Sequence, residues 1–304
     1  MCIRDSSSGV PHNENLENFK KYCEFFFGEY NSSNALFSSF SKNIGAHYCF
    51  GKEVYKELPE KEKKWILEGK DAFLLGLHGP DLLFYYFPLV KNRVNQQGVH
   101  LHQELAADFF EKGLKKYRQS EDPVLRAYLY GFICHFILDS ECHPYINCYM
   151  EEKNLGHLEI ETEFDRYLME RDGKDPLQYA PIHHLISRSH TRRIIASMFD
   201  RITPRQIDVC IRYFRHTIRF FICRNRRKQK VLQFFFGLIG QKKGIGGLIT
   251  DGVFNSHCAE SDQFLEERLT HSIKLAAEEI TNYSKALDKK GFLSMRLYRN
   301  YEEI

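Results

Sequence analysis

The sequence lacks the patterns that mark several common classes of protein. Its 9 Cys include no CxxC pair, which excludes a zinc finger built on paired cysteines. No apolar run reaches the roughly 18 residues of a membrane span, and we find no signal-peptide core near the start. Cysteines among apolar neighbours, such as Cys134 and Cys210, are typical of proteins in a reducing compartment. We therefore expect a cytoplasmic protein.

A large excess of one charge and β-type alternation are also missing. The chain has 43 Lys and Arg against 40 Asp and Glu, and its net charge of +3 gives no strong indication of nucleic-acid binding. Hydrophobic residues make up 43% of the chain, which is enough for a large core and excludes global disorder. Few runs alternate with period two, whereas helical spacing recurs throughout. We predict an all-α, multi-helix bundle.

The predicted organisation is one domain behind an N-terminal extension. Residues 1–43 begin with a polar stretch rich in Ser and Asn. We expect this extension to be disordered or partly non-native, with one short helix between 15 and 40. Residues 44–304 contain no convincing linker. They are predicted to form a single helical domain.

Breaks and caps locate the expected helices of this domain. We place His47 just ahead of a helix, and Asp81 at a loop or a new helix start after the Gly79-Pro80 break. Residues 91–98 are expected to form a polar loop, followed by a helix that begins near residue 100. Further helices are expected over residues 123–140, 155–170, 181–222 and from 261 onward, with Thr203 and Pro204 as a helix cap and first position.

The apolar run GFICHFILDSECHPYI carries three titratable side chains at a spacing of four. On a helix, His135, Asp139 and His143 share one face. Downstream, His157 and Glu161 in GHLEIETEFDRYL repeat the i, i+4 spacing. Imidazoles and carboxylates in this arrangement are typical metal ligands.

A single histidine on an apolar helix is more often an ordinary core residue than a metal ligand. Here the helix around His135 is apolar enough to be buried. An isolated buried Asp139 is costly unless it is paired or bound to a cation. The carboxylate and its neighbouring imidazoles together therefore favour a metal site.

The candidate ligands come from several segments that can meet in one cleft between packed helices. Their number exceeds the roughly four ligands of one zinc ion, so we predict two or three metal ions. Pairs of ions about 3.5–4 Å apart are the usual machinery of phosphoester hydrolysis. Mixed imidazole and carboxylate ligands without cysteine favour a catalytic zinc site. The candidates are His47, Asp81, His100 or His102, His135, Asp139, His143, His157 and Glu161.

The order and spacing of these residues resemble the bacterial zinc-dependent phospholipase C family, which includes clostridial alpha-toxin. The resemblance covers about residues 44–170. The segments AHYCFG, HGPDLLFYY and CHFILDSECHPYI look closest to an unsecreted clostridial branch. The matching motifs are an early His47, G-x3-P-D ending at Asp81, a downstream histidine, H-x3-D at His135 and Asp139, H-P at His143, and G-H-x3-E at His157 and Glu161.

The resemblance implies an all-helical fold of the phospholipase C and P1 nuclease type that binds three zinc ions. One ion would be held by Asp81, His100 or His102, His135 and Asp139, a second by His143, His157 and Glu161, and a third by Asp139 and His47. Asp81 would also serve as general base. Spacing does not separate His100 from His102, and we slightly prefer His102. Secreted members complete the third site with an N-terminal tryptophan, whereas this chain has only Trp65, so we expect two or three ions.

The implied activity is cleavage of a phospholipid to diacylglycerol and a phosphorylated head group by in-line attack of a metal-bound hydroxide. Peripheral contact with a membrane is a further expectation, and the sequence does not indicate an oligomeric state. One alternative is a zinc-dependent, nuclease-like phosphoesterase, which aromatic residues placed to stack on bases would favour. The other is a non-catalytic metal- or lipid-binding protein, whose metal would lack an open position.

Several further residues show weaker patterns. Asp165 lies one turn beyond Glu161 and could orient a ligand histidine, or simply be solvated. His78, beside the Gly-Pro break, could touch the substrate. The other histidines, including the pair at 183–184, have no ligand spacing, and we expect them at the surface or in the core. The basic run 219–230, interleaved with phenylalanine, could face anionic lipid or nucleic acid, or be a solvated helix end.

Overall fold

The computed structural model describes residues 44–88, 90–241 and 244–301. These residues lie within one compact unit, Asn34–Ile304. The N-terminal extension and the helix expected between 15 and 40 fall outside the described residues. No sequence pattern divides residues 44–304 further, and the single-domain assignment stays a prediction.

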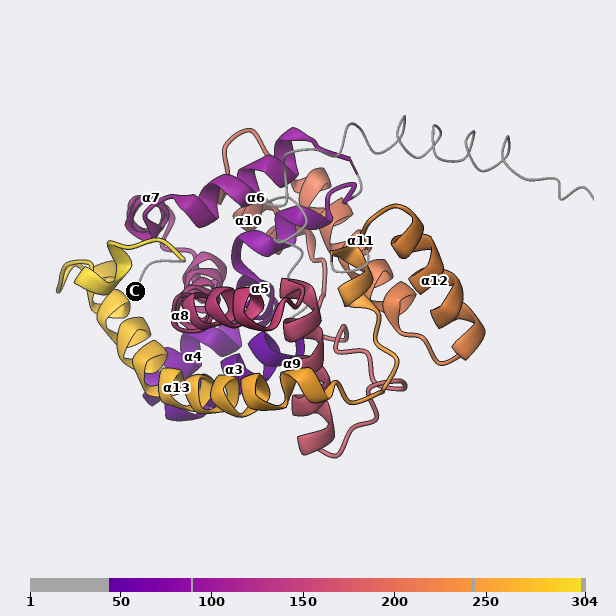
Figure 1. Ribbon diagram of the computed structural model, residues 1–304. Coiled ribbons are helices and arrows are strands. Elements are labelled where there is room, and N and C mark those ends of the chain that lie inside the picture. Colours follow the sequence, from indigo (N-terminus) through magenta and orange to yellow (C-terminus); the bar gives the residue numbers. More distant parts are fainter. Residues whose placement is uncertain (1–43, 89, 242–243, 302–304) are drawn as a thin grey trace, which may run out of the picture. The chain divides into compact units, whose positions relative to one another are not determined.

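The described residues form helices joined by turns, and their only β-type pairing is an isolated bridge between Ile222 and Thr250. The all-α prediction is therefore confirmed. In chain order the elements (Figure 1) are α3 (Ile44–Glu57), α4 (Glu60–Glu68), α5 (Lys70–Gly76), η1 (Gly79–Tyr85), α6 (Arg93–Gln103), α7 (Ala106–Ser120), α8 (Pro123–Lys153), α9 (His157–Arg171), α10 (Ser189–Met198), α11 (Pro204–Phe221), α12 (Arg226–Leu238), η2 (Ile245–Leu248), η3 (Ser256–Cys258), α13 (Ala259–Leu287) and η4 (Met295–Leu297).

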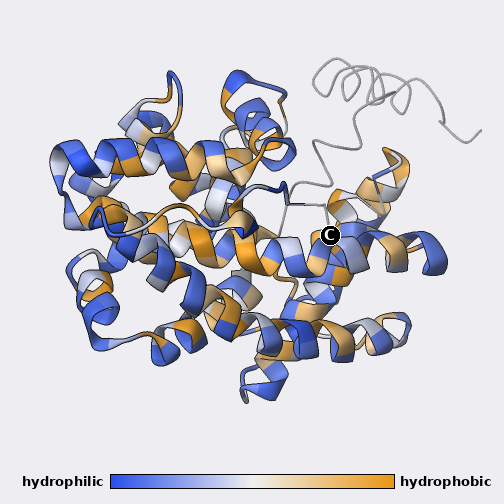
Figure 2. Ribbon diagram, turned by 90° about the vertical axis from the view of Figure 1, so that its left-hand side faces the viewer, coloured by the Kyte–Doolittle hydropathy of each residue, from blue (hydrophilic) through white to orange (hydrophobic). Residues whose placement is uncertain are grey.

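Helix α8 is the centre of the fold. Its residues from Leu125 to Ser140 are buried, and it packs against α5, α13, α4 and α3. Figure 2 shows mixed apolar and polar colouring on the surrounding helices, which is typical of amphipathic elements that cover a core. A helix that is apolar on every side must be covered by amphipathic helices on every side, which explains why the other helices pack around α8.

The expected end of this central helix was wrong. We predicted residues 123–140, but α8 continues through Pro144 to Lys153, where Asn154 adopts a left-handed conformation and ends it. A proline inside a helix costs about 3 kcal/mol because one backbone hydrogen bond is lost. Burial of Ile146 and Tyr149 beyond the proline offsets that cost. The continuation keeps His143 in the same helix as the two upstream ligand candidates.

Glycines let α5 and the turn that follows it approach α8 closely. A Cβ on Gly131 of α8 would lie 2.1 Å from the carbonyl oxygen of Phe73 and 3.0 Å from the Cα atom of Gly76. Gly79 has a φ of 46°, and a Cβ there would lie 2.0 Å from Cδ2 of His135. Larger residues cannot occupy these positions without moving the backbone. The crossing therefore brings η1 directly against the ligand-bearing stretch of α8.

The predicted polar loop over residues 91–98 was also wrong. Asn92 accepts hydrogen bonds from the backbone N–H groups of Val94 and Asn95, and the Asn95 side chain accepts from the Asn92 N–H, which makes a capping box. The capped polar segment forms α6, whose last turn carries His100 and His102. These histidines end a helix, whereas we expected them to begin one.

Three smaller boundaries also differ from the expectation. His47 lies in the first turn of α3 and not ahead of it. Residues 181–184 are turns and residues 185–188 have no regular secondary structure, and the helical part begins with α10. The last long helix begins at Ala259. The cap at Thr203 with Pro204 in the first position is confirmed, since Gln206 N–H donates to the threonine hydroxyl.

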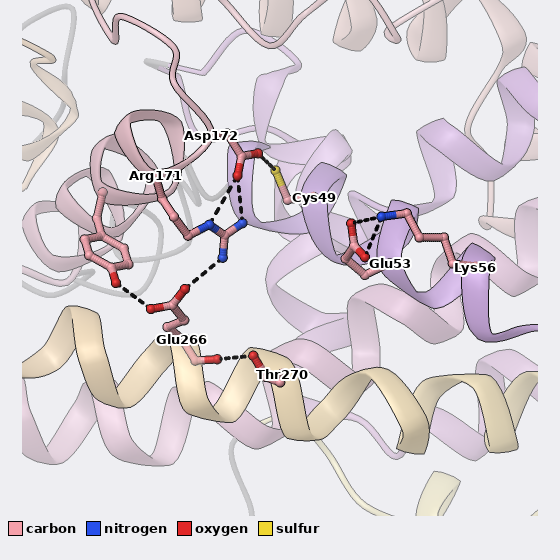
Figure 3. A network of polar contacts seen from close by, with 8 residues as sticks. Cys49, Glu53, Lys56, Arg171, Asp172, Glu266 and Thr270 are labelled. Carbon is pink, nitrogen blue, oxygen red and sulfur yellow. Dashed lines mark hydrogen bonds and ion pairs between the residues drawn. The ribbon is translucent and has the colours of Figure 1, made fainter.

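Polar contacts tie the end of α9 to α13 and α3 (Figure 3). Arg171 donates to Glu266 of α13 at 2.9 Å and to Asp172 at 3.0 Å. The Cys49 thiol of α3 lies 3.7 Å from the other Asp172 oxygen. These contacts fix α9, which carries two ligand candidates, relative to α3, which carries His47.

Candidate metal centre

One group of potential ligands joins three elements at the centre of the unit. His47 of α3, Asp81 of η1, and His135 and Asp139 of α8 are all buried, and each offers a ligand atom within 4.8 Å of the others. His47 Nε2 lies 3.3 Å from Asp139 Oδ1, and His135 Nε2 lies 3.1 Å from Asp139 Oδ2. Residues about 90 positions apart are thus brought together by helix packing.

A second group joins α8 to α9. His143, His157 and Glu161 offer ligand atoms within 4.8 Å of one another. His157 Nε2 lies 3.2 Å from Glu161 Oε1, and His143 Nε2 lies 3.8 Å from the same oxygen. His143 Nε2 is also 3.9 Å from Asp139 Oδ2. Asp139 therefore lies between the two groups, which form one continuous cluster.

The structure places the two alternative histidines of α6 differently. His102 Nε2 lies 3.1 Å from Asp81 Oδ1, while its Nδ1 is 2.8 Å from the Gly98 carbonyl oxygen, to which it can donate. A backbone acceptor on one ring nitrogen directs the other towards a ligand position. His100 is exposed and pairs with Glu104 at 2.9 Å. Only His102 lies at the cluster.

Asp165 holds the start of α3 in place. Its carboxylate accepts hydrogen bonds from the backbone N–H groups of Gly45 and Ala46 at 3.1 and 2.8 Å. These N–H groups belong to the first turn of α3, where helix donors lack partners of their own. The contact positions the turn that bears His47. From the sequence, Asp165 was either a carboxylate that orients a ligand histidine or a solvated one; in the structure it is buried and binds the backbone beside His47.

Burial and mutual charge shift the protonation of the cluster strongly. Burial tends to raise the pKa of Asp139, but His135 and neighbouring imidazoles hold that pKa well below its usual range. Burial also opposes ionisation of Glu161, yet His157 and His143 lower its pKa to about 2. The pKa of His143 is about 9, because nearby carboxylates outweigh burial, which acts in the opposite direction. Burial lowers the pKa of His135 to about 4.

The donor set fits zinc. Zinc bonds of about 2.0–2.2 Å to nitrogen and oxygen place tetrahedral ligands roughly 3.3–3.5 Å apart. The closest nitrogen–oxygen separations in both groups lie near that value. Although His47 and His135 lie close to Asp139, both ring nitrogens of each histidine and Asp139 Oδ2 are buried without a hydrogen bond of good geometry among the described residues. Buried polar atoms normally have partners, and a bound cation would supply them here.

A further pair of histidines lies beside the first group. His78 Nε2 is 2.8 Å from His184 Nε2, and both side chains are buried. The His184 ring also stacks on Tyr48, with ring centres 4.5 Å apart. Burial lowers the pKa of both histidines, that of His184 to about 3, so the pair is neutral and one ring donates to the other. Sequence spacing gave no sign of His184, because its partner lies 106 residues away.

Trp65 and the cysteines noted in the sequence are not among the ligand candidates. Trp65 of α4 packs under Arg126, with the guanidinium 4.6 Å from its ring centre. Among the described residues, Cys134, Cys142 and Cys210 are free and buried, as expected for small apolar side chains. None of the described helices is both long and apolar enough to cross a membrane.

A comparison with protein-family models agrees with this geometry. The model of zinc-dependent phospholipase C matches residues 46–213, more than half of the chain. This range includes every ligand candidate from His47 to Glu161. No curated protein and no solved structure matches the chain. The chain therefore belongs to the zinc-dependent phospholipase C family.

Proposed function

We propose that this protein is a zinc-dependent phosphodiester hydrolase that cleaves a phospholipid to diacylglycerol and a phosphorylated head group. The family supports a phospholipase-type zinc hydrolase and a phospholipid substrate. The observation that carries the proposal is the continuous cluster in which Asp139 lies between two groups of ligand candidates. Single-ion structural sites need only about four ligands and no shared carboxylate.

We assign the ligands by their place in the cluster. His47, Asp81, His102, His135 and Asp139 would hold zinc on one side. His143, His157 and Glu161 would hold it on the other, giving two or three ions in all. Bound zinc polarises phosphoryl oxygens and acidifies water.

Asp81 is the residue we assign to proton transfer. It is buried at the start of η1, and His102 lies 3.1 Å from one of its oxygens, so its carboxylate is held in a fixed orientation. A carboxylate in this position can accept the proton of an attacking water molecule. The neutral pair of His78 and His184 lies behind the same turn, where the Asp81 backbone N–H donates to the His78 carbonyl at 3.0 Å. That pair would hold the turn, and with it the Asp81 carboxylate, in a fixed position.

The test combines metal content with product analysis. Zinc-replete protein is incubated with phospholipid in mixed micelles, and diacylglycerol is measured by mass spectrometry. Asp81→Asn should lower kcat by about 10²–10⁴-fold, the usual contribution of a general base. Asp108→Asn, on the exposed side of α7, is the matched control and should retain activity.

Other outcomes point to the alternative functions. Release of nucleotides from single-stranded nucleic acid without diacylglycerol would identify a nuclease-like phosphoesterase. Stoichiometric zinc without hydrolysis of either substrate would identify a non-catalytic metal-binding protein. Less than one zinc ion per chain under zinc-replete conditions would refute the hydrolase altogether.

A further inference from the structure

Helix α12 carries apolar side chains on two opposite faces. Leu232 and Phe236 are buried, and the Phe236 ring stacks on Phe221 of α11 with ring centres 5.8 Å apart. Val231 and Phe234 are 64% and 71% exposed. The buried pair fixes the rotation of the helix about its axis, so the second apolar face is presented to solvent by the fold itself.

The exposed face is flanked by cations of its own helix. The α12 sequence RRKQKVLQFFFGL contains no Asp or Glu. Arg226, Arg227 and Lys230 are exposed, and among the described residues none of them forms an ion pair. Helical spacing places Arg227 on the same side as Val231 and Phe234. We call the residues Arg227, Lys230, Val231, Phe234 and Leu238 the α12 face.

The end of α11 carries exposed residues of the same kind. Lys228 donates to the backbone carbonyls of Phe220 and Ile222, the latter at 3.0 Å, and so holds the start of α12 against the end of α11 (Figure 1). Phe220 is 51% exposed, and Arg219 beside it is also exposed. Exposed aromatic and basic residues therefore recur at the junction of the two helices.

An anionic lipid surface is the partner that matches this chemistry. Helices that lie in a membrane interface combine Lys and Arg with an apolar face that enters the acyl boundary. Cations near such a surface are attracted to its phosphates. Nucleic acid would use the cations and an aromatic ring, but it would leave Val231 exposed.

The α12 face connects to the metal centre through η2. This short element follows α12 in the chain and contacts both α12 and α9. Gly247 of η2 lies so close to α9 that a Cβ there would be 2.8 Å from the Glu159 backbone nitrogen. That nitrogen is in the first turn of α9, which begins at His157. The family match ends at residue 213, so it does not cover α12.

We propose that the α12 face docks the protein onto anionic phospholipid surfaces. Phe234 and Val231 enter the acyl boundary, while Arg227 and Lys230 contact lipid phosphates. The inference rests on the proposed function in so far as the docked lipid is also the source of the substrate. It adds a surface that positions the metal centre at the membrane.

The experiment measures flotation with vesicles of phosphatidylcholine alone or with 30% phosphatidylglycerol, in low and high salt. Wild-type protein should float with the anionic vesicles and be released by salt. Arg227→Gln/Lys230→Gln should bind roughly 25-fold more weakly, since each of the two cations near an anionic surface contributes about fivefold. Val231→Ser/Phe234→Ser should weaken binding at least as much. Phe292→Ser, at a residue 94% exposed elsewhere, is the control and should bind as the wild type does.

Flotation of both double variants equal to that of the wild type, or no flotation of the wild type, would overturn the proposal. The proposal would also be overturned if the wild type bound a single-stranded oligonucleotide but no vesicles, and if the same variants abolished the oligonucleotide binding. Each variant is checked for an unchanged thermal midpoint, so that a loss of fold is recognised. Vesicle binding is measured apart from hydrolysis. A protein that docks through this face but releases no diacylglycerol would refute the proposed function and leave the docking surface standing.

Discussion

Replacing Asp139 with asparagine removes the one charge that lies between the two ligand groups and keeps the side chain's shape. One oxygen of Asp139 lies 3.3 Å from His47 Nε2, and the other lies 3.1 Å from His135 Nε2 and 3.9 Å from His143 Nε2. An asparagine side chain offers one oxygen, and its amide nitrogen is not a metal ligand. The variant therefore loses a ligand on at least one side of the cluster.

The expected size of the effect follows from the share of one ligand in zinc binding. Structural zinc with four ligands is bound by about 10–16 kcal/mol, or roughly 2.5–4 kcal/mol per ligand. At about 1.4 kcal/mol per factor of ten, one lost ligand weakens binding on the order of 100-fold or more. Because both oxygens of Asp139 face imidazoles, both sides of the cluster should be affected.

The assay is elemental mass spectrometry of protein dialysed against buffered free zinc. Wild-type protein should retain two or three ions per chain, and the Asp139→Asn variant one or fewer, with a matching loss of phospholipid hydrolysis. Asp208→Asn is the matched control, because Asp208 pairs with Arg192 at 2.7 Å on α10 and α11 and not with a ligand candidate. Zinc content and activity of the Asp139 variant equal to those of the wild type would refute the assignment of the shared ligand.

Three further predictions concern histidines. The pKa of His143 is about 9 in the folded chain, against an ordinary value of about 6.5. Protonated His143 therefore stabilises the metal-free protein fully below pH 6.5, and this contribution is lost as the pH rises through 9. Thermal midpoints measured in chelator should show this loss, and His143→Gln should flatten it; an unchanged slope would contradict the environment described for His143. His102→Ala should weaken zinc binding about 100-fold, while His100→Ala should not, and equal zinc contents would contradict the choice of His102. His184→Phe should lower kcat by about 10–100-fold with zinc retained, because His78 loses its partner; loss of zinc would instead make His184 a ligand, and unchanged kcat would show that the pair is only structural.

Local spacing predicted which ligand candidates share a helix face. His135 and Asp139, and likewise His157 and Glu161, are one turn apart, so helical geometry alone puts them on one face. The structure places both pairs at the cluster. These pairs could be predicted because the helical period of about 3.6 residues does not depend on the rest of the fold.

Contacts between distant segments could not be derived in this way. His47 and Asp81 reach the cluster because α3 and η1 pack on α8, and the latter approach requires glycine at 79. His184 pairs with a residue 106 positions away and has no local pattern at all. The prediction of a loop at 91–98 failed for a different reason, because polar composition outweighed the cap formed by Asn92.

Helix α12 shows most clearly why exposure cannot be derived from composition. Phe234 and Phe236 stand two residues apart in one basic, aromatic run, yet one is 71% exposed and the other is buried. A residue step of 100° puts them on opposite sides of the helix, but only the packing of Phe236 on α11 decides which side faces solvent. From sequence, a lipid-facing surface and a solvated helix end were both open interpretations. The orientation seen here leaves Val231 and Phe234 uncovered beside Arg227 and Lys230. A helix end with no role beyond contact with water would not require two large apolar side chains to be exposed there.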